Sequence, residues 1–179
     1  MTYRFGNLAS GVVPGAVSGA SSQDVADTAT AITPITITAG LVPTYLTCDA
    51  LGLNTGAMFL QGGITNIWNA ATNRLDLSQL SLGDRVDIRI DVTITTAAPN
   101  TEIELGLVGG IGGFQFKTPF YGEIIKSASV RRRTPTGFFI IRSTSTRDNP
   151  AALYCATDGA GLDTVVVNGF LISVTPFSP

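Results

Sequence analysis

The sequence predicts an all-β protein, a single jelly-roll-like β-sandwich with an extended N-terminal arm. Apolar and polar residues alternate along many short runs, as they do on strands that have one face in a core. Thr, Val and Ile crowd these runs, and such β-branched side chains pack better on a pleated sheet than on a helix. Turn signals recur roughly every eight to twelve residues, which is typical of sandwiches and barrels. The length of 179 residues suits one such domain.

Residues 1–30 are predicted to be the arm and residues 31–179 the sandwich. The arm is rich in Gly, Ala and Ser and shows no sustained hydrophobic period, so it lacks the residues for a core of its own. Near its start, two aromatic residues, a cation and an aliphatic residue precede the small residues, which is the composition of an anchor followed by a tether. These candidate partner-binding residues are Tyr3, Arg4, Phe5 and Leu8.

About ten strands are predicted within the sandwich, each from its own alternation or β-branched run. In chain order they cover residues 31–38, 42–49, 57–61, 63–69, 85–96, 101–109, 114–117, 121–128, 137–147, 151–157 and 164–175. Residues 71–84 interrupt the series, because the leucines of this segment fit either a short helical turn or an irregular loop. No long helix is predicted.

The strand over residues 85–96 carries charged residues on one face, namely Arg85, Asp87, Arg89 and Asp91. One interpretation is a solvated outer face, with the arginines paired across an antiparallel hairpin to the glutamates of residues 101–109. The other interpretation is a pair of glycosidase carboxylates. Arginines beside the carboxylates keep them ionised and oppose the raised pKa that a general acid needs, so the outer-face interpretation is favoured.

Histidine is absent from the sequence, which removes Ser-His-Asp and Cys-His nucleophile arrangements and histidine-ligated zinc. The nucleophile-elbow, phosphate-loop and CxxC motifs are absent as well. The glycine-rich segments 109–114 and 158–163 are expected to form turns rather than a phosphate loop or a calcium loop. We therefore predict that the protein is not an enzyme and uses no cofactor or metal.

Cys48 and Cys155 lie far apart in the sequence, outside any metal-binding spacing, and both fall in strand-like runs. We expect reduced, half-buried thiols that pack as small hydrophobic groups. A mutual disulfide is the alternative.

The composition favours a surface that faces other proteins. Charged residues make up 13% of the chain against about a quarter in average proteins, and only Lys117 and Lys126 are lysine. Because lysine keeps free surfaces soluble and is depleted in interfaces, we expect an oligomer. The net charge of −2 gives no attraction for nucleic acid or an anionic membrane. No segment approaches the roughly 20 apolar residues that span a bilayer, and residues 1–11 lack a secretory signal, so synthesis in the cytoplasm is expected.

An unbroken apolar run is the candidate subunit interface, and its members are Phe138, Phe139, Ile140 and Ile141. A half-exposed strand would alternate, so both faces of this strand should be covered, one by the core and the other by a subunit or a loop. Either the pair Phe138 and Ile140 or the pair Phe139 and Ile141 faces the partner.

A basic cluster is the other candidate contact surface, and it consists of Arg131, Arg132 and Arg133. With Pro135 and Gly137 directly behind it, the cluster indicates a turn. It either contacts an acidic patch of a partner protein or is solvated. A nucleic-acid site would need interleaved aromatic residues and a broader basic face.

The segments WNAATNRLDLSQLSLGDRVDIRIDVTITTAAPNTEIELGLVGG and VVVNGFLISVT carry the strand order of a known class of proteins. Over roughly residues 57–175 the chain resembles the β-sandwich domains of tailed-phage structural proteins, in particular head-decoration or cement proteins and fibre heads. The resemblance implies a sandwich of jelly-roll or tumour-necrosis-factor-like topology, often trimeric, with no catalytic residues.

We therefore expect a non-enzymatic virion protein, made in the host cytoplasm and located on the capsid surface, that stabilises a phage head through inter-subunit contacts. The expected partners are itself, as a homotrimer, and the major capsid protein or another virion protein, with neither nucleic acid nor membrane. The alternative is the receptor-binding head of a phage fibre or spike that recognises a host-surface glycan or protein. Fibres commonly need a shaft, and residues 1–30 contain neither heptads nor collagen-like triplets, so the decoration role is favoured.

Overall fold

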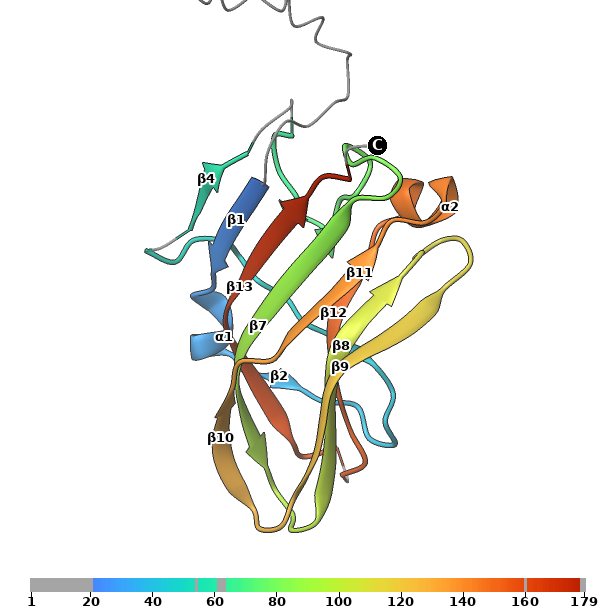
Figure 1. Cartoon of the computed structure of the whole chain (residues 1–179). Coiled ribbons are helices and arrows are strands. Elements are labelled where there is room, and N and C mark those ends of the chain that lie inside the picture. The colour runs from blue at the N-terminus through green and yellow to red at the C-terminus, as the bar shows by residue number, and fades with distance from the viewer. Residues whose placement is uncertain (1–20, 54, 61–63, 160, 178–179) are drawn as a thin grey trace, which may run out of the picture.

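The protein is a sandwich of two antiparallel sheets, as a computed structural model describes it for residues 21–53, 55–60, 64–159 and 161–177 (Figure 1). The seven-stranded sheet has the order β10-β7-β13-β1-β4, with β11 also paired to β7 and β2 to β13. The four-stranded sheet has the order β3-β12-β8-β9. The predicted fold class is confirmed. No helix among the described residues has the length and hydropathy needed to cross a membrane.

The strands of the larger sheet are β1 (Ser21–Ala26), β2 (Ile35–Thr36), β4 (Gly56–Phe59), β7 (Arg85–Thr96), β10 (Ser129–Arg133), β11 (Thr136–Ile140) and β13 (Thr164–Thr175). Those of the smaller sheet are β3 (Thr44–Tyr45), β8 (Thr101–Gly109), β9 (Phe116–Ile125) and β12 (Ala152–Thr157). The remaining elements are the two-stranded ribbon of β5 (Trp68–Asn69) and β6 (Arg74–Leu75) and the short helices α1 (Ala29–Ile32) and α2 (Thr144–Asp148).

The core lies between the two sheets and is built by alternate residues of the long strands. On β7 the inward residues include Val86, Ile88 and Ile90, and all three are fully buried. This alternation is the period-2 pattern that a strand with one solvated face requires. The rings of Trp68 and Phe170 pack with their centroids 4.9 Å apart. The strongest sequence patterns therefore coincide with the strands that hold the sandwich together.

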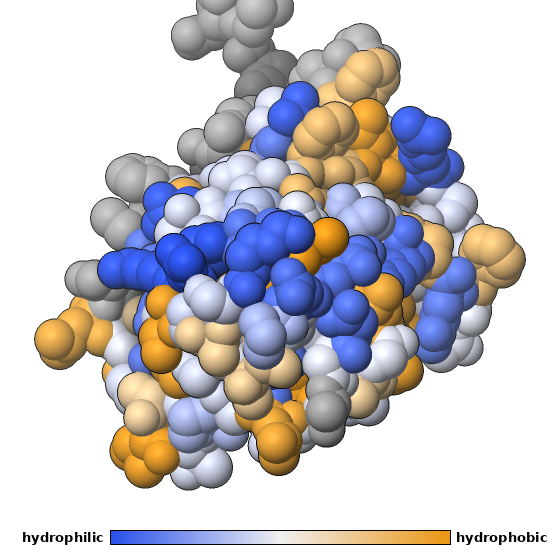
Figure 2. Space-filling view, turned by 90° about the horizontal axis from the view of Figure 1, so that it is seen from below, coloured by the Kyte–Doolittle hydropathy of each residue, from blue (hydrophilic) through white to orange (hydrophobic). Residues whose placement is uncertain are grey.

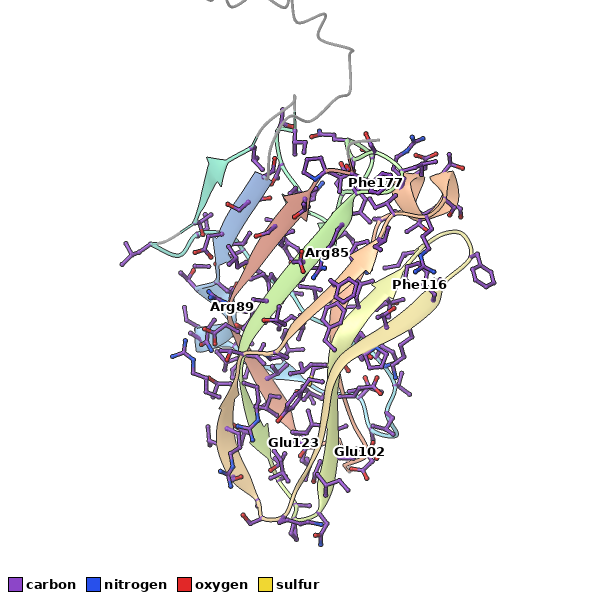
Figure 3. All side chains as sticks on the ribbon, viewed as in Figure 1. Arg85, Arg89, Glu102, Phe116, Glu123 and Phe177 are labelled. Atoms are coloured by element: carbon purple, nitrogen blue, oxygen red, sulfur yellow. The ribbon has the colours of Figure 1, made fainter. Side chains whose placement is uncertain are left out.

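The predicted hairpin between residues 85–96 and 101–109 is wrong. β7 pairs with β13, β10 and β11, whereas β8 pairs with β9 and β12 in the other sheet. The chain changes sheets at residues 97–100. Arg85 on the larger sheet consequently lies far from Glu102 at the lower end of the smaller one (Figure 3). The hydrophobic period fixes which face of a strand is buried, but it does not fix which strand lies beside it.

Residues 21–30 belong to the sandwich rather than to the arm, so the predicted boundary at residue 30 moves toward the N-terminus. β1 lies between β13 and β4, and its residues Ser21, Gln23 and Val25 are buried. Gln23 Oε1 accepts hydrogen bonds from the backbone N–H groups of Ile67 (2.8 Å) and Trp68 (3.0 Å), which offsets the cost of burying an amide. A strand of small and polar residues gives no apolar run, and the sequence pattern therefore missed it.

Other segments also differ from the prediction, and residues 114–117 and 121–128, predicted as separate strands, contribute to the single strand β9. Residues 31–38 contain the end of α1 and the short β2, and residues 137–147 contain β11 followed by α2. Ser143 begins α2, because its side-chain oxygen accepts a hydrogen bond from the N–H of Thr146 at 3.2 Å. The basic cluster, predicted as a turn, forms β10.

Candidate protein-interaction surface

The run of Phe138 to Ile141 divides between the core and the surface. Phe139 and Ile141 point into the sandwich and are 7% and 0% exposed, whereas Phe138 and Ile140 are 51% and 37% exposed. Of the two predicted alternatives, the pair that remains open to a partner is therefore Phe138 and Ile140. Ile141 lies just beyond β11 and continues its pairing, since its N–H donates to the carbonyl of Asp84 at 3.0 Å.

A groove of about 480 Å³ runs beside this pair. It lies between the first half of β9 and the second half of β11, and it ends at α2. The residues that line it are Phe114, Phe116, Thr118, Phe138, Phe139, Ile140, Arg142, Ser143 and Thr146. Phe114, in the turn between β8 and β9, is 83% exposed. We call this feature the β9–β11 groove.

The groove exists because the sandwich is closed only along part of this side. β9 pairs with β8 and β11 with β7, so each forms an edge of its sheet. Farther down the two edges, the ring of Phe120 fills the space beside Gly137, where an added Cβ would lie 2.0 Å from the ring. Toward α2, aromatic side chains line the opening between the two edges, among them Phe116 on β9 (Figure 3).

The outer wall of the groove carries a guanidinium group on an aromatic ring. The Cζ atom of Arg85 lies 4.1 Å from the ring centroid of Phe138, and its Nη2 lies 2.7 Å from Asp87 Oδ1. Such cation–π contacts hold a ring in place while leaving its other face free. Phe138 is therefore an oriented surface aromatic and not a loose side chain.

The arginine cluster closes the lower half of the same side. Arg132 forms an ion pair with Asp91 at 2.5 Å, and Arg133 reaches across to Glu123 on β9, which also accepts a hydrogen bond from the Tyr121 hydroxyl. Partial burial raises the pKa of Glu123, but the hydrogen bonds from Tyr121 and Arg133 outweigh it and hold that pKa below its ordinary value. Two of the three predicted contact arginines are thus bound within the chain.

Arg131, like Arg132, is exposed, and its Nε donates a hydrogen bond to Ser129 Oγ at 3.2 Å. Seen from below, hydrophilic side chains gather in a band across this end of the molecule (Figure 2). The two ends of the open side are therefore chemically different, charged below and aromatic above.

The candidate glycosidase carboxylates lie on β7 and β8, and three of them, Asp87, Asp91 and Glu104, form ion pairs. Glu104 lies 2.6 Å from Lys117 Nζ and accepts a hydrogen bond from the buried Tyr154 hydroxyl, and Asp91 binds Arg132. Although burial raises the pKa of each, these contacts lower the pKa of both carboxyls below the ordinary value. A general acid needs the opposite shift.

The glycine-rich segments are turns whose polar groups serve the backbone. Asp158 Oδ1 accepts a hydrogen bond from the N–H of Glu102 at 2.7 Å, and Asp163 Oδ1 accepts one from the N–H of Ala97 at 2.8 Å. In the turn before β9, Gly110 and Gly112 adopt φ values of 71° and 95°, which residues other than glycine rarely adopt. Among the residues that the structure describes, no group of three or more acidic, Cys or His side chains could hold a metal ion.

Both thiols are buried and free, as predicted, although they are buried completely rather than by half. Burial raises the pKa of Cys48 and of Cys155 to about 12. Such thiols are inert at neutral pH because the reactive species is the thiolate.

The predicted anchor residues Tyr3, Arg4, Phe5 and Leu8 lie outside the described residues. In contrast, sequence reasoning missed Phe114 and Phe116 as part of the surface. Phe114 and Phe116 alternate with Gln115 directly after a glycine-rich turn, a pattern that predicts the start of a strand. That this strand lies beside β11 follows only from the topology.

No family model matches the chain, and no curated protein matches it in sequence. Three solved structures match the chain at low sequence identity. A Clostridium thermocellum endo-1,4-beta-D-xylanase 10B fragment with CBM22-1 and GH10 modules is 11% identical with a TM-score of 0.41, and the match covers 88% of this chain and 29% of the xylanase chain. The coat protein of Tobacco streak virus is 16% identical with a TM-score of 0.28, over 53% of this chain and 64% of the coat protein.

The empty top component of Cowpea mosaic virus contains a chain that is 11% identical with a TM-score of 0.31, over 92% of this chain and 84% of that one. All three TM-scores lie below 0.5, so each of these matches is distant. This chain spans less than a third of the xylanase chain.

Proposed function

We propose that this protein is a non-enzymatic virion component, a decoration or cement protein that stabilises a phage head through contacts between its own subunits and with the capsid. The observation that carries the proposal is the β9–β11 groove, an aromatic surface that lies open at one end of the sandwich. Exposed aromatic and aliphatic side chains around a concave surface mark protein contacts.

The composition supports the same role. With 13% charged residues the chain is poorly suited to a free surface on all sides. Burying apolar area at subunit boundaries contributes roughly 25 cal/mol per Å² and needs no covalent chemistry, so such contacts can resist pressure on a shell. The subunit contact is assigned to Phe138 and Ile140. Tyr3, Arg4, Phe5 and Leu8 are assigned to the contact of the arm with the capsid or with an adjacent subunit, and Arg131 to a second contribution.

Binding to particles tests the proposal. The full-length protein is mixed with phage heads stripped of this component, and the bound fraction and the copy number per head are measured by sedimentation. We expect saturable binding at on the order of hundreds of copies per head, as a symmetric shell requires. Deletion of residues 2–20 should greatly weaken it. Saturation at a few dozen copies or fewer would favour the fibre alternative, and the absence of binding would overturn the virion role.

A further inference from the structure

The free edge of β11 presents backbone groups to the β9–β11 groove. The N–H of Ile90 donates to the carbonyl of Pro135 at 2.9 Å, and the N–H of Ile141 donates to Asp84 at 3.0 Å. Antiparallel partners exchange hydrogen bonds at every second residue, so Gly137 and Phe139 also bond to β7. The N–H and C=O groups of Phe138 and Ile140 consequently point away from β7, into the groove.

An exposed edge of this kind is a template for another strand, and proteins normally protect it with charge, proline or a cover. β10, on the same side of β7, has that protection in Arg131–Arg133. β11 has none of these features, since its residues are Thr136, Gly137, Phe138, Phe139 and Ile140. The unprotected part of the edge coincides with the aromatic groove.

We propose that residues 2–8 of a neighbouring copy of this chain add to β11 as a further strand and fill the groove. The segment reads TYRFGNL, and Thr, Tyr and Phe favour strands. Its alternation places Tyr3 and Phe5 on one face and Arg4 on the other, which matches a position with an apolar groove on the inner side and the solvated face of the larger sheet on the outer side. Backbone hydrogen bonds would supply affinity and the two aromatic rings specificity.

The geometry of the chain allows this exchange. Ser21, the first described residue, pairs with Val174 on β13. In the adjacent row of the sheet, Thr175 on β13 pairs with Arg85 on β7, and Arg85 pairs with Ile140 on β11. Three strand spacings of about 4.8 Å thus separate the start of β1 from the groove, at the same end of the sandwich (Figure 1). Residues 6–20 can extend over about 50 Å, which is ample to reach the groove of an adjacent subunit.

This inference rests on the self-association that is part of the proposed function, but it does not require a capsid. Its test is residue-resolved hydrogen exchange of the full-length oligomer by NMR. In the wild type, the amides of Phe138 and Ile140 should be protected as well as those of Gly137 and Phe139. In a Tyr3→Ser/Phe5→Ser variant the first two should exchange about tenfold faster or more, while the other two stay unchanged.

A Val12→Ser/Val13→Ser variant is the matched control, because it removes two apolar residues of the tether and should keep all four amides protected. The source of the strand is tested by refolding a labelled Tyr3→Ser/Phe5→Ser variant together with excess unlabelled wild type. Slow exchange of Phe138 and Ile140 should then return in the labelled chains, since their neighbours supply intact segments.

Equal exchange of Phe138 and Ile140 in the wild type and in the Tyr3→Ser/Phe5→Ser variant would overturn the proposal. Protection in the pure wild type without recovery in the mixture would assign the strand to its own chain, which also overturns it. A wild type that sediments as a monomer would instead remove the self-association on which the inference rests, so the two failures are distinguishable.

Discussion

Gly137 decides how the open side of the sandwich is divided. Because it has no side chain, the ring of Phe120 lies against β11 and joins the two sheet edges below the groove. One position farther along, Phe138 is turned outward and held by Arg85. Gly137 thus separates the part of β11 that Phe120 closes from the part that faces the groove. Neighbouring residues differ in this way because side chains alternate between the two faces of a strand.

The clearest prediction at the residue scale concerns the two faces of β7. Ile88 is fully buried, so Ile88→Ala should destabilise the fold by about 2 to 5 kcal/mol through lost burial and a residual cavity. Asp87 lies on the solvated face beside Arg85, and Asp87→Asn should leave the unfolding midpoint nearly unchanged. Urea unfolding of both variants measures the difference. A larger loss for Asp87→Asn would mean that the faces of the strand are reversed.

Alkaline pH should destabilise the protein through its buried thiols. Burial raises the pKa of Cys48 and Cys155 from 9.0 to about 12, so the folded state keeps these protons while the unfolded chain loses them. The contribution is complete below pH 9 and declines as pH rises toward 12. Thermal unfolding measured between pH 8 and pH 11 should therefore show a falling midpoint. The slope should be smaller in a Cys48→Ala/Cys155→Ala variant, and an identical slope would contradict this account.

At the scale of elements, the long alternating strands could be predicted and their neighbours could not. β7, β8 and β13 have the bounds that their patterns indicate: β7 and β13 bury alternate residues, and β8 is buried on both faces in its second half. β1 was not predicted because Gln23 stands where an apolar residue would face the core. Its side-chain oxygen accepts hydrogen bonds from the N–H groups of Ile67 and Trp68. For residues 138–141 the sequence left two alternatives for the exposed pair, because an unbroken apolar run does not show which residues face the core.

The link between the two sheets gives a prediction at acid pH. The hydrogen bonds from Tyr121 and Arg133 outweigh partial burial and lower the pKa of Glu123 below 4.5, so its stabilising effect is present above pH 4.5 and is lost as pH falls through the folded-state value. The unfolding midpoint of the wild type should drop between pH 5 and pH 3. In a Glu123→Gln variant the unfolding midpoint should fall less over the same pH range.

Glu102→Gln is the matched control for this experiment, because Glu102 is an exposed carboxylate on the adjacent strand β8. Its pH profile should follow the wild type. If both substitutions changed the profile equally, the ion pair between β9 and β10 would not be the group responsible.

At the scale of the whole molecule, the side of the sandwich formed by β9, β10 and β11 has two chemically different ends. The lower end is held by ion pairs and presents charge, and the upper end presents aromatic rings and unprotected strand edge. A protein with such a polarity can pack against copies of itself at one end while the other stays solvated. The composition predicts an oligomer, but the groove at which we propose that the subunits meet follows only from the topology that places β9 beside β11.

The last prediction is that the isolated protein sediments as a closed oligomer, with three subunits as the expected number. Phe138 is 51% exposed, so burying the rest of its ring in a subunit contact contributes about half of the roughly 1.5 to 3 kcal/mol that full burial of a Phe side chain gives. Phe138→Asp should therefore shift sedimentation toward the monomer at micromolar concentration. Val130→Asp is the matched control, because Val130 is 64% exposed on β10, at the charged end of the same side. It should sediment as the wild type does, and circular dichroism and thermal unfolding of both variants establish that each remains folded. A wild type that is monomeric at these concentrations, or a Phe138→Asp variant as oligomeric as its control, would show that the β9–β11 groove is not where subunits meet.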